Sequence, residues 1–244
     1  MKIVRQKNEK TKIGLDLSME NMFINRMLLL EGKLKIEQMK DHIYAVLGAG
    51  YETSGNAIAH CVLILALHPE IQEKTYREII NVFPYEDSVI DNSSLSQCDF
   101  LDRVFKETLR FAPAVPTLGR EALEDFELSS DLSIKKGTIF CVDVMGLHRR
   151  KSLWGEDADL FNPDRFLPEN FSGKEHFFMP FSVGKRNCLG YKYASVSFKL
   201  VLLKLLRNFE YTTSLKLKEI KFTRQLALKL IGPHLVSIQK RNKN

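Results

Sequence analysis

Clustered cysteines and long apolar runs are both missing from this 244-residue sequence. The four cysteines are Cys61, Cys98, Cys141 and Cys188. No two of them form a Cys-x-x-Cys pair, so the sequence indicates neither a zinc site nor a disulfide framework, and a reducing compartment is expected. The longest purely apolar stretches, such as residues 62–67, are far too short to span a bilayer. The polar, basic residues 1–12 contain no apolar core of a signal peptide.

A nucleic-acid-binding motif is also missing, although the net charge is +6 and the isoelectric point is near 9.0. The basic residues are scattered, so no nucleic-acid partner is expected. The positive charge fits an acidic protein partner, an anionic membrane surface, or a surplus of solvated lysines. With 44% hydrophobic and 27% charged residues, the composition is that of an ordinary globular protein with one substantial core or two small domains.

Hydrophobic spacing predicts a mainly α-helical chain with small β-sheets. Helices are predicted over residues 21–30, 36–67, 69–83, 100–111 and 189–209. A loop is predicted over residues 85–97, and strands are predicted over residues 115–121, 125–128, 137–144, 209–213 and 234–239. Pro69 and Pro113 mark the ends of the helices that precede them.

The predicted helix over residues 36–67 contains a run rich in small residues, Gly48-Ala49-Gly50-Tyr51-Glu52-Thr53-Ser54. Two glycines weaken a helix locally, and a threonine hydroxyl can bond back to a carbonyl one turn earlier. Together they predict a kink or a groove that holds water, where Glu52 and Thr53 form a candidate proton-delivery site. The alternative is a crossing point at which another helix packs closely.

Cys188 lies in the stretch Phe181-Ser182-Val183-Gly184-Lys185-Arg186-Asn187-Cys188-Leu189-Gly190, directly before a predicted helix. A helix N-terminus favours a thiolate over a thiol, and Arg186 adds a fixed positive charge. Gly184 and Gly190 permit tight turns and let the loop lie flat against a broad surface. A nucleophile, a redox sensor and an axial metal ligand are open as uses of this thiolate, and a small buried hydrophobe is the simpler alternative.

The full pattern Phe-x-x-Gly-x-Arg-x-Cys-x-Gly resembles the haem-binding loop of the cytochrome P450 family. It matches at every defining position, namely Phe181, Gly184, Arg186, Cys188 and Gly190. The resemblance implies that Cys188 is the proximal thiolate ligand of the haem iron and that Arg186 faces a haem propionate. It implies the C-terminal half of the cytochrome P450 fold, with a long central kinked helix, a Glu-x-x-Arg helix, a meander, the cysteine loop and a proximal helix.

The run of small residues resembles the central-helix signature of the same family, Ala/Gly-Gly-x-Asp/Glu-Thr-Thr/Ser. This resemblance implies that Thr53 and Glu52 act in oxygen activation and proton relay. It also implies that Ala49 and Gly50 let haem and O2 come close. Some members of the family carry, at the position of Ala49, a glutamate that can esterify the haem, and its absence here argues against a covalent link.

Glu107 and Arg110 lie three residues apart, so they share one face of the predicted helix over residues 100–111. Alone, they would form a surface pair worth under ~1 kcal/mol. The segment Phe161-Asn162-Pro163-Asp164-Arg165-Phe166 resembles the family's Pro-Glu-Arg-Phe segment, with aspartate for glutamate. The resemblance implies a buried, structural Glu107–Arg110–Arg165 network, in which loss of one member costs roughly 3–5 kcal/mol. Trp154, in a stretch that resembles the meander, is expected to be a packing residue.

Substrate contacts are expected after the Glu-x-x-Arg helix, because in the family this segment passes the haem edge and lines the pocket. The candidates are Val115, Pro116, Thr117 and Leu118, together with Leu226 in a turn expected to dip into the pocket. Arg120 aligns with an arginine that binds a haem propionate, as a guanidinium fork would. The alternative for Arg120 is an exposed arginine on a strand.

The resemblance implies a monooxygenase that uses haem b to activate O2 and insert one oxygen atom into an apolar lipid, hormone or xenobiotic. Electrons are expected from NADPH through NADPH-cytochrome P450 reductase, with cytochrome b5 as a further partner. Lys185 and Lys192 are candidates for meeting an acidic reductase surface. The sequence resembles eukaryotic microsomal members, especially insect relatives of the long-chain-hydroxylase clan, which act on the cytosolic face of the endoplasmic reticulum membrane.

The resemblance covers only the C-terminal part of the family's domain. Residues 1–244 are therefore expected to form a partial domain without the N-terminal membrane anchor and cap region. One alternative function is a truncated, catalytically impaired haem-binding or non-enzymatic fragment. Another is a haem-thiolate isomerase or dehydratase, although such an enzyme would not need the relay of Glu52 and Thr53.

Overall fold

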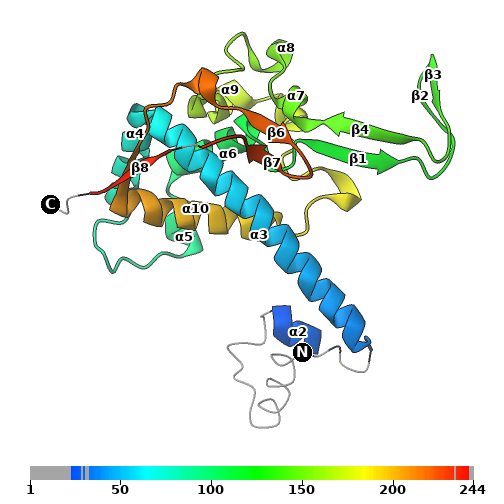
Figure 1. The fold of residues 1–244 in the computed structure, drawn as a ribbon, viewed down its shortest axis with the longest axis horizontal. Coiled ribbons are helices and arrows are strands. Elements are labelled where there is room, and N and C mark those ends of the chain that lie inside the picture. Colours follow the sequence, from blue (N-terminus) through cyan, green and yellow to red (C-terminus); the bar gives the residue numbers. More distant parts are fainter. Residues whose placement is uncertain (1–22, 29, 31–32, 234, 242–244) are drawn as a thin grey trace. The chain divides into compact units, whose positions relative to one another are not determined.

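The computed structural model describes residues 23–28, 30, 33–233 and 235–241 (Figure 1). The chain divides into two compact units, Met1–Tyr51 and Glu52–Asn244. Helix α3 (Ile36–Leu67) passes from the first unit into the second. The helix predicted over residues 36–67 is therefore confirmed to the residue, and Gly48 and Gly50 do not interrupt it.

The first unit contains helix α2 (Phe23–Leu28) and the first part of α3. Its small apolar cluster is made by Met27 and Met39, with Leu34 packed against them. The predicted helix over residues 21–30 is thus shorter in the described part of the chain, and its residues 21, 22 and 29 lie outside the described residues.

Three helices pack together in the second unit, namely α4 (Pro69–Val82), α6 (Asp99–Phe111) and α10 (Tyr191–Asn208). The end of α3 joins the same core, because Ile64 and Leu65 are fully buried there. These three helices confirm the helices predicted over residues 69–83, 100–111 and 189–209, with small shifts at the ends. The core also contains Ile79, Leu101, Val104, Leu109, Leu202, Leu203 and Leu206.

A carboxylate from α4 caps the start of α6. The Glu78 Oε1 atom accepts a hydrogen bond from the Phe100 N–H at 2.7 Å, and its Oε2 atom accepts one from the Leu101 N–H at 2.8 Å. The first N–H groups of a helix have no partner within the helix, and they favour negative charge. Glu78 therefore fixes the register between α4 and α6.

The predicted loop over residues 85–97 contains a short helix, α5 (Asn92–Leu95), so this part of the prediction is wrong. Asp91 Oδ1 accepts a hydrogen bond from the Ser94 N–H at 2.8 Å, and Ser94 Oγ accepts one from the Asp91 N–H at 3.0 Å. This reciprocal capping box, together with the burial of Leu95, stabilises a turn too short to show helical periodicity.

The strands of the described chain form four two-stranded antiparallel sheets. Strand β1 (Thr117–Glu121) pairs with β4 (Ile139–Asp143), and the hairpin of β2 (Phe126–Ser129) and β3 (Leu132–Ile134) connects them (Figure 1). The strands predicted over residues 115–121 and 137–144 are confirmed in shortened form, and the strand predicted over residues 125–128 is confirmed with a shift of one residue, whereas β3 was not predicted.

The C-terminal sheets are formed by β5 (Phe209–Thr212) with β8 (Ser237–Lys240), and by β6 (Phe222–Arg224) with β7 (Leu228–Leu230). The two closing strands predicted over residues 209–213 and 234–239 are confirmed, although His234 lies outside the described residues. The buried Gln72 side chain of α4 binds both backbone groups of Tyr211 in β5 at 2.8 and 2.9 Å.

Short helical segments connect β4 to α10. They are α7 (Val144–His148), α8 (Lys151–Trp154), the 3₁₀ helix η2 (Pro163–Phe166), α9 (Pro168–Phe171), η3 (Glu175–Phe177) and η4 (Gly184–Arg186), and η5 (Leu217–Glu219) follows β5. Trp154 is buried against Ala158 and Phe166, as expected of a packing residue. The mainly α class with small sheets is confirmed. Among the described helices, none has the length and apolar character needed to cross a membrane.

Candidate functional site

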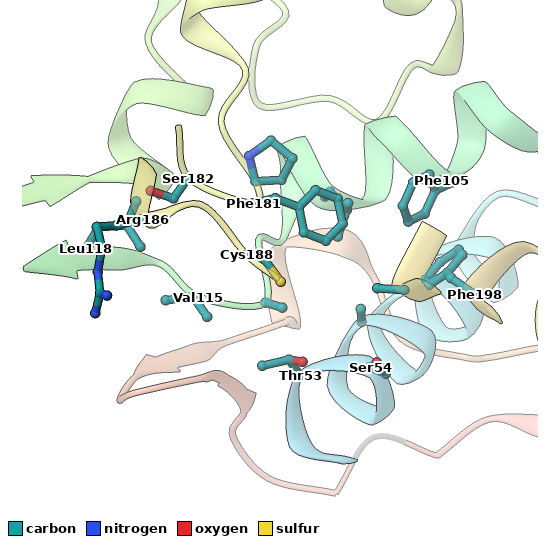
Figure 2. Close-up of a pocket in the computed structure, with 15 residues that line it drawn as sticks. Thr53, Ser54, Phe105, Val115, Leu118, Phe181, Ser182, Arg186, Cys188 and Phe198 are labelled. Carbon is teal, nitrogen blue, oxygen red and sulfur yellow. The ribbon is translucent and has the colours of Figure 1, made fainter. Parts of the chain in front are cut away.

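Cys188 borders a cavity of about 250 Å³ in the second unit. Figure 2 shows Thr53 and Ser54 of α3 on one side of this cavity and the segment carrying Cys188 on another. The lining is largely apolar and comprises Thr53, Ser54, Ala57, Phe105, Leu109, Ala114, Val115, Leu118, Pro180, Phe181, Ser182, Arg186, Cys188, Ala194 and Phe198. Helices α3, α6 and α10 and the cysteine loop therefore meet at one hollow.

The cysteine loop is closed by its own backbone. The Cys188 N–H donates to the Phe181 carbonyl at 2.9 Å, and the Asn187 N–H donates to the Gly184 carbonyl at 3.1 Å. Gly184 has φ +76°, a left-handed conformation that glycine adopts readily. Helix α10 begins at Tyr191 with Gly190 at its N-cap, so the exposed Cys188 thiol lies just before a helix N-terminus.

The two candidate relay residues have different surroundings. Thr53 lines the cavity, whereas Glu52 does not. The Glu52 carboxylate lies 2.8 Å from the Lys229 Nζ atom of β7, and both side chains are partly exposed. Ala49 and Gly50 belong to the first unit and lie within α3.

Glu107 and Arg110 form a fully buried ion pair. Arg110 Nε donates to Glu107 Oε2 at 2.6 Å, and Nη2 donates to Oε1 at 2.7 Å. The other Arg110 N–H groups donate to the carbonyl oxygens of His148, Ala158 and Leu160 at 2.8 to 3.0 Å. Burial raises the pKa of the Glu107 carboxyl, and the hydrogen bonds and charge of Arg110 oppose that rise.

Arg165 lies next to this pair, with its Nε atom 3.6 Å from Glu107 Oε1. Its hydrogen bonds go to the Trp154 carbonyl at 2.7 Å and to both the side chain and the backbone of Asp157. Hydrogen bonding from Arg165 lowers the pKa of the Asp157 carboxyl. Asp157 thus joins the network of Glu107, Arg110 and Arg165, although no sequence pattern indicated Asp157.

The other candidate residues divide into two groups. Val115, Leu118, Phe181 and Arg186 line the cavity, while Pro116, Thr117, Arg120, Gly184 and Gly190 do not. Arg120 instead donates a hydrogen bond to Ser182 Oγ at 2.8 Å. Leu226 is 85% exposed in the turn between β6 and β7 and is not brought to the cavity. The cause is local, because the Leu228 N–H donates to the Ala114 carbonyl at 2.9 Å and Leu228, not Leu226, enters the core.

Several functional candidates were missed by reasoning from the sequence. Phe105 and Phe198 both line the cavity, but their spacing in the sequence is that of ordinary core residues of α6 and α10. Ser182 occupies a variable position of the loop pattern. The one usable signal was the spacing of Thr53 and Ala57, which places both on one helix face.

His148 links the buried ion pair to the cysteine loop. Its carbonyl accepts from Arg110 Nη1 at 2.9 Å, and its ring Nε2 accepts from the Met179 N–H at 3.0 Å. Burial lowers the pKa of the imidazole to about 4, because imidazolium is poorly solvated there and Arg110 is close. A neutral ring is what the bond from Met179 requires.

The residues around the cavity fit a broad apolar group that binds one thiolate. Cys188 is an exposed, unpaired thiol at the edge of aromatic and aliphatic walls. Arg186 in the lining and Arg120 beside it supply cationic donors that suit carboxylates. Within the part of the chain that is described, no cluster of His, Cys, Asp and Glu side chains would hold a metal ion alone.

Comparison with known proteins gives one family. The family model described as Cytochrome P450 matches residues 1–237. The protein named "Probable cytochrome P450 313a4" from Drosophila melanogaster is 34% identical over 248 residues, covering 98% of this chain and 50% of the relative. "Probable cytochrome P450 313a1" from the same species is 38% identical over 225 residues, covering 91% and 46%. "Cytochrome P450 4c21" from Blattella germanica is 33% identical over 213 residues, covering 87% and 42%. The chain spans about half the length of the curated relatives it matches.

Proposed function

The chain belongs to the cytochrome P450 family, and we propose that it serves a haem-thiolate monooxygenase in which Cys188 ligates the haem iron. The observation that carries the proposal is the placing of Cys188 and Thr53 on different walls of one apolar cavity. A thiolate ligand and a hydroxyl beside the reacting face are the two polar groups that this chemistry needs.

The residues of the cysteine loop hold Cys188, the proposed ligand of the haem iron, in place. The Cys188 N–H bond to the Phe181 carbonyl fixes the direction of the cysteine, and Gly184 provides the turn that flattens the loop. Gly190, at the N-cap of α10, ends the loop before the helix. Arg186 and Arg120 are assigned to the haem propionates, because a guanidinium binds a carboxylate through paired N–H donors.

The opposite wall controls protons. Bound haem supplies activation of O2 and insertion of one oxygen atom into an apolar substrate, using electrons from outside the chain. Thr53 is assigned to hold a proton donor at the cavity, with Glu52 as the acid that exchanges protons with solvent and Ala49 and Gly50 as the small residues of the same helix. An isomerase or dehydratase would not need this arrangement, so the position of Thr53 favours a monooxygenase.

The remaining assignments concern substrate, partners and location. Val115 and Leu118, with Pro116 and Thr117 beside them, are assigned to an apolar substrate such as a lipid, hormone or xenobiotic. NADPH-cytochrome P450 reductase and cytochrome b5 are the proposed electron donors, with the surface around Lys185 and Lys192 as their docking face. The endoplasmic reticulum membrane is the proposed location. Residues 1–244 are assigned to the C-terminal part of the family's domain.

Haem ligation is tested by adding haem to the chain and recording the absorption spectrum of its reduced, CO-bound form. The wild-type chain is expected to show a thiolate-type Soret band, and Cys188→Ser is expected to lose it. Cys141→Ser is the matched control, because Cys141 is also exposed but lies on β4. A band that survives in Cys188→Ser, or that never forms in the wild-type chain, would remove Cys188 from the proposed role.

The role of Thr53 is tested by the ratio of peroxide to oxygenated product in a form of the protein that turns over. Thr53→Ala is expected to raise this ratio several-fold, which is less than the roughly 10²–10⁴-fold contribution of a positioned acid or base, because Thr53 holds the proton donor and is not itself the acid. Ser54→Ala is the control, because Ser54 neighbours Thr53 and also lines the cavity. Equal ratios in the wild type and Thr53→Ala would assign proton delivery elsewhere.

A further inference from the structure

The turn that leads into the cysteine loop holds an unusual backbone conformation. Ser182 has φ +62°, and it is the only residue other than glycine with positive φ in the described part of the chain. Side chains with a Cβ avoid this region, so such a residue persists only where its surroundings enforce it. The conformation at Ser182 therefore calls for a reason beyond making a turn, which glycine would make more easily.

Ser182 is held through both its backbone and its side chain. Its N–H donates to the Met179 carbonyl at 3.0 Å, and the Met179 N–H in turn donates to the buried His148 ring at 3.0 Å. Its Oγ atom accepts a hydrogen bond from Arg120 Nη2 at 2.8 Å. The left-handed conformation thus presents the Ser182 hydroxyl to an arginine on a strand 62 residues earlier in the chain.

The contact holds Arg120 beside Ser182, which lines the cavity. Arg120 and Leu118 lie two residues apart on β1, so their side chains leave the same face of the strand, and Leu118 lines the cavity. Figure 2 shows Ser182, Arg186 and Leu118 in the same part of the view, and all three line the cavity. The Arg120 Nη1 atom is also held, by the Gly119 carbonyl at 2.8 Å.

The Arg120 guanidinium keeps unused donors after these two bonds. A guanidinium has an N–H on Nε and two on each terminal nitrogen, and the Gly119 and Ser182 bonds use one on each terminal nitrogen. The fork is therefore oriented without being saturated. A guanidinium that is already held in place and keeps free N–H donors binds a carboxylate with a smaller loss of side-chain entropy than a mobile arginine does.

We propose that Ser182 is a positioning residue whose hydroxyl presets Arg120 to bind a carboxylate of the haem. This inference rests on the proposed haem-binding function and adds a residue to it. The competing interpretation is that Ser182 only shapes the loop around Cys188. The two differ in one respect, because a preset arginine matters only when the bound group carries free carboxylates.

Two substitutions separate the hydroxyl from the backbone conformation. Ser182→Gly removes the Oγ atom and adopts φ +62° without strain, so the loop keeps its shape. Ser182→Asn tolerates the left-handed region and offers a side-chain oxygen to Arg120. Urea unfolding of each variant without haem checks that the fold is retained.

The measurement is the dissociation constant of residues 1–244 for haem and for haem dimethyl ester, whose carboxylates are blocked, obtained by absorbance titration. For haem, Ser182→Gly is expected to weaken binding about tenfold, the low end of the ~10–100-fold lost when outer partners of a metal site are removed. Ser182→Asn is expected to restore most of this affinity. For the dimethyl ester, the wild type and Ser182→Gly are expected to bind equally.

Arg120→Gln provides the matched background. In that variant Ser182→Gly is expected to cause no further loss, because the hydroxyl acts through Arg120. Equal losses for haem and its ester, or a full additional loss beside Arg120→Gln, would overturn the inference in favour of loop shape alone. Unchanged haem affinity in Ser182→Gly would also overturn it.

The proposed function fails by a different result. A wild-type chain that takes up no haem, or that gives the same CO spectrum after Cys188→Ser, overturns haem ligation by Cys188 and the role of Ser182 together. A normal thiolate spectrum with an unchanged Ser182→Gly affinity overturns only the role of Ser182.

Discussion

Replacing Arg110 with methionine is expected to destabilise the protein more than any change to an exposed ion pair. Methionine keeps the length and much of the volume of arginine but removes its charge and all its donors. In the folded chain Arg110 makes five hydrogen bonds from a completely buried guanidinium. Every N–H of the side chain is used, so the substitution removes a donor from both Glu107 carboxylate oxygens and from three backbone carbonyls.

The magnitude follows from what remains after the substitution. Glu107 stays buried and keeps only the Asn162 N–H at 2.8 Å and Arg165 at 3.6 Å. Removing one partner of a buried ion pair costs about 3–5 kcal/mol. The carbonyls of His148, Ala158 and Leu160 lose donors as well, so the loss of stability is expected to be at least about 3 kcal/mol. Because a domain is stable by roughly 5–15 kcal/mol, Arg110→Met is expected to consume a large part of that margin.

The assay is urea unfolding followed by circular dichroism, with Arg224→Met as the control. Arg224 pairs with Asp143 at 3.1 Å, but both side chains are about half exposed, so the control should lose under ~1 kcal/mol. The loss in Arg110→Met is expected to be smaller at pH 5 than at pH 8, because an unpaired Glu107 in this buried site takes up a proton. A loss in Arg110→Met within 1 kcal/mol of the control (about the ceiling for an exposed pair) would refute the reasoning.

Two further predictions follow from buried titratable groups. The folded chain holds the His148 pKa at about 4, below its ordinary 6.5, so between these values only the unfolded chain takes up the proton. The contribution of His148 to stability is therefore full above pH 6.5 and falls by about 3 kcal/mol towards pH 4. In urea unfolding at several pH values, His148→Gln should remove this part of the dependence of stability on pH. An unchanged dependence of stability on pH in His148→Gln would contradict this prediction. Burial raises the pKa of the Cys61 thiol to about 12 and of the Cys98 thiol to about 11, so an aromatic disulfide reagent should label only the exposed Cys141 and Cys188 quickly. Fast labelling of four thiols without denaturant would show that the core is open.

Long elements with clear end signals were predictable from the sequence. Helix α3 was predicted to its last residue, because its apolar spacing is sustained and His68-Pro69 stops it. Helix α5 was missed because its four residues are shorter than the window in which periodicity can be seen, and its cap depends on side-chain hydrogen bonds of Asp91 and Ser94. Strand β3 was missed for the same reason of length.

The candidate site was predictable where its residues are contiguous in the chain and not where they meet through packing. The loop around Cys188 is one segment, so its pattern is visible in the sequence. Phe105 and Phe198 approach each other with ring centroids 4.8 Å apart only because α6 packs on α10. His148 and Ser182 carry no pattern at all, and their roles depend on single hydrogen bonds across the fold.

The Gln72 clamp ties an early helix to a late strand. One amide side chain takes the place of a neighbouring strand for Tyr211, across 139 residues of sequence, and Arg241 reaches back to Glu73 of the same helix at 3.2 Å. During synthesis, α4 leaves the ribosome long before either partner exists, so its buried amide stays hydrated until the C-terminal strands arrive. Contacts of such long separation slow folding. The second unit is thus expected to fold as a whole after synthesis, with its C-terminal sheet as the step that completes the core.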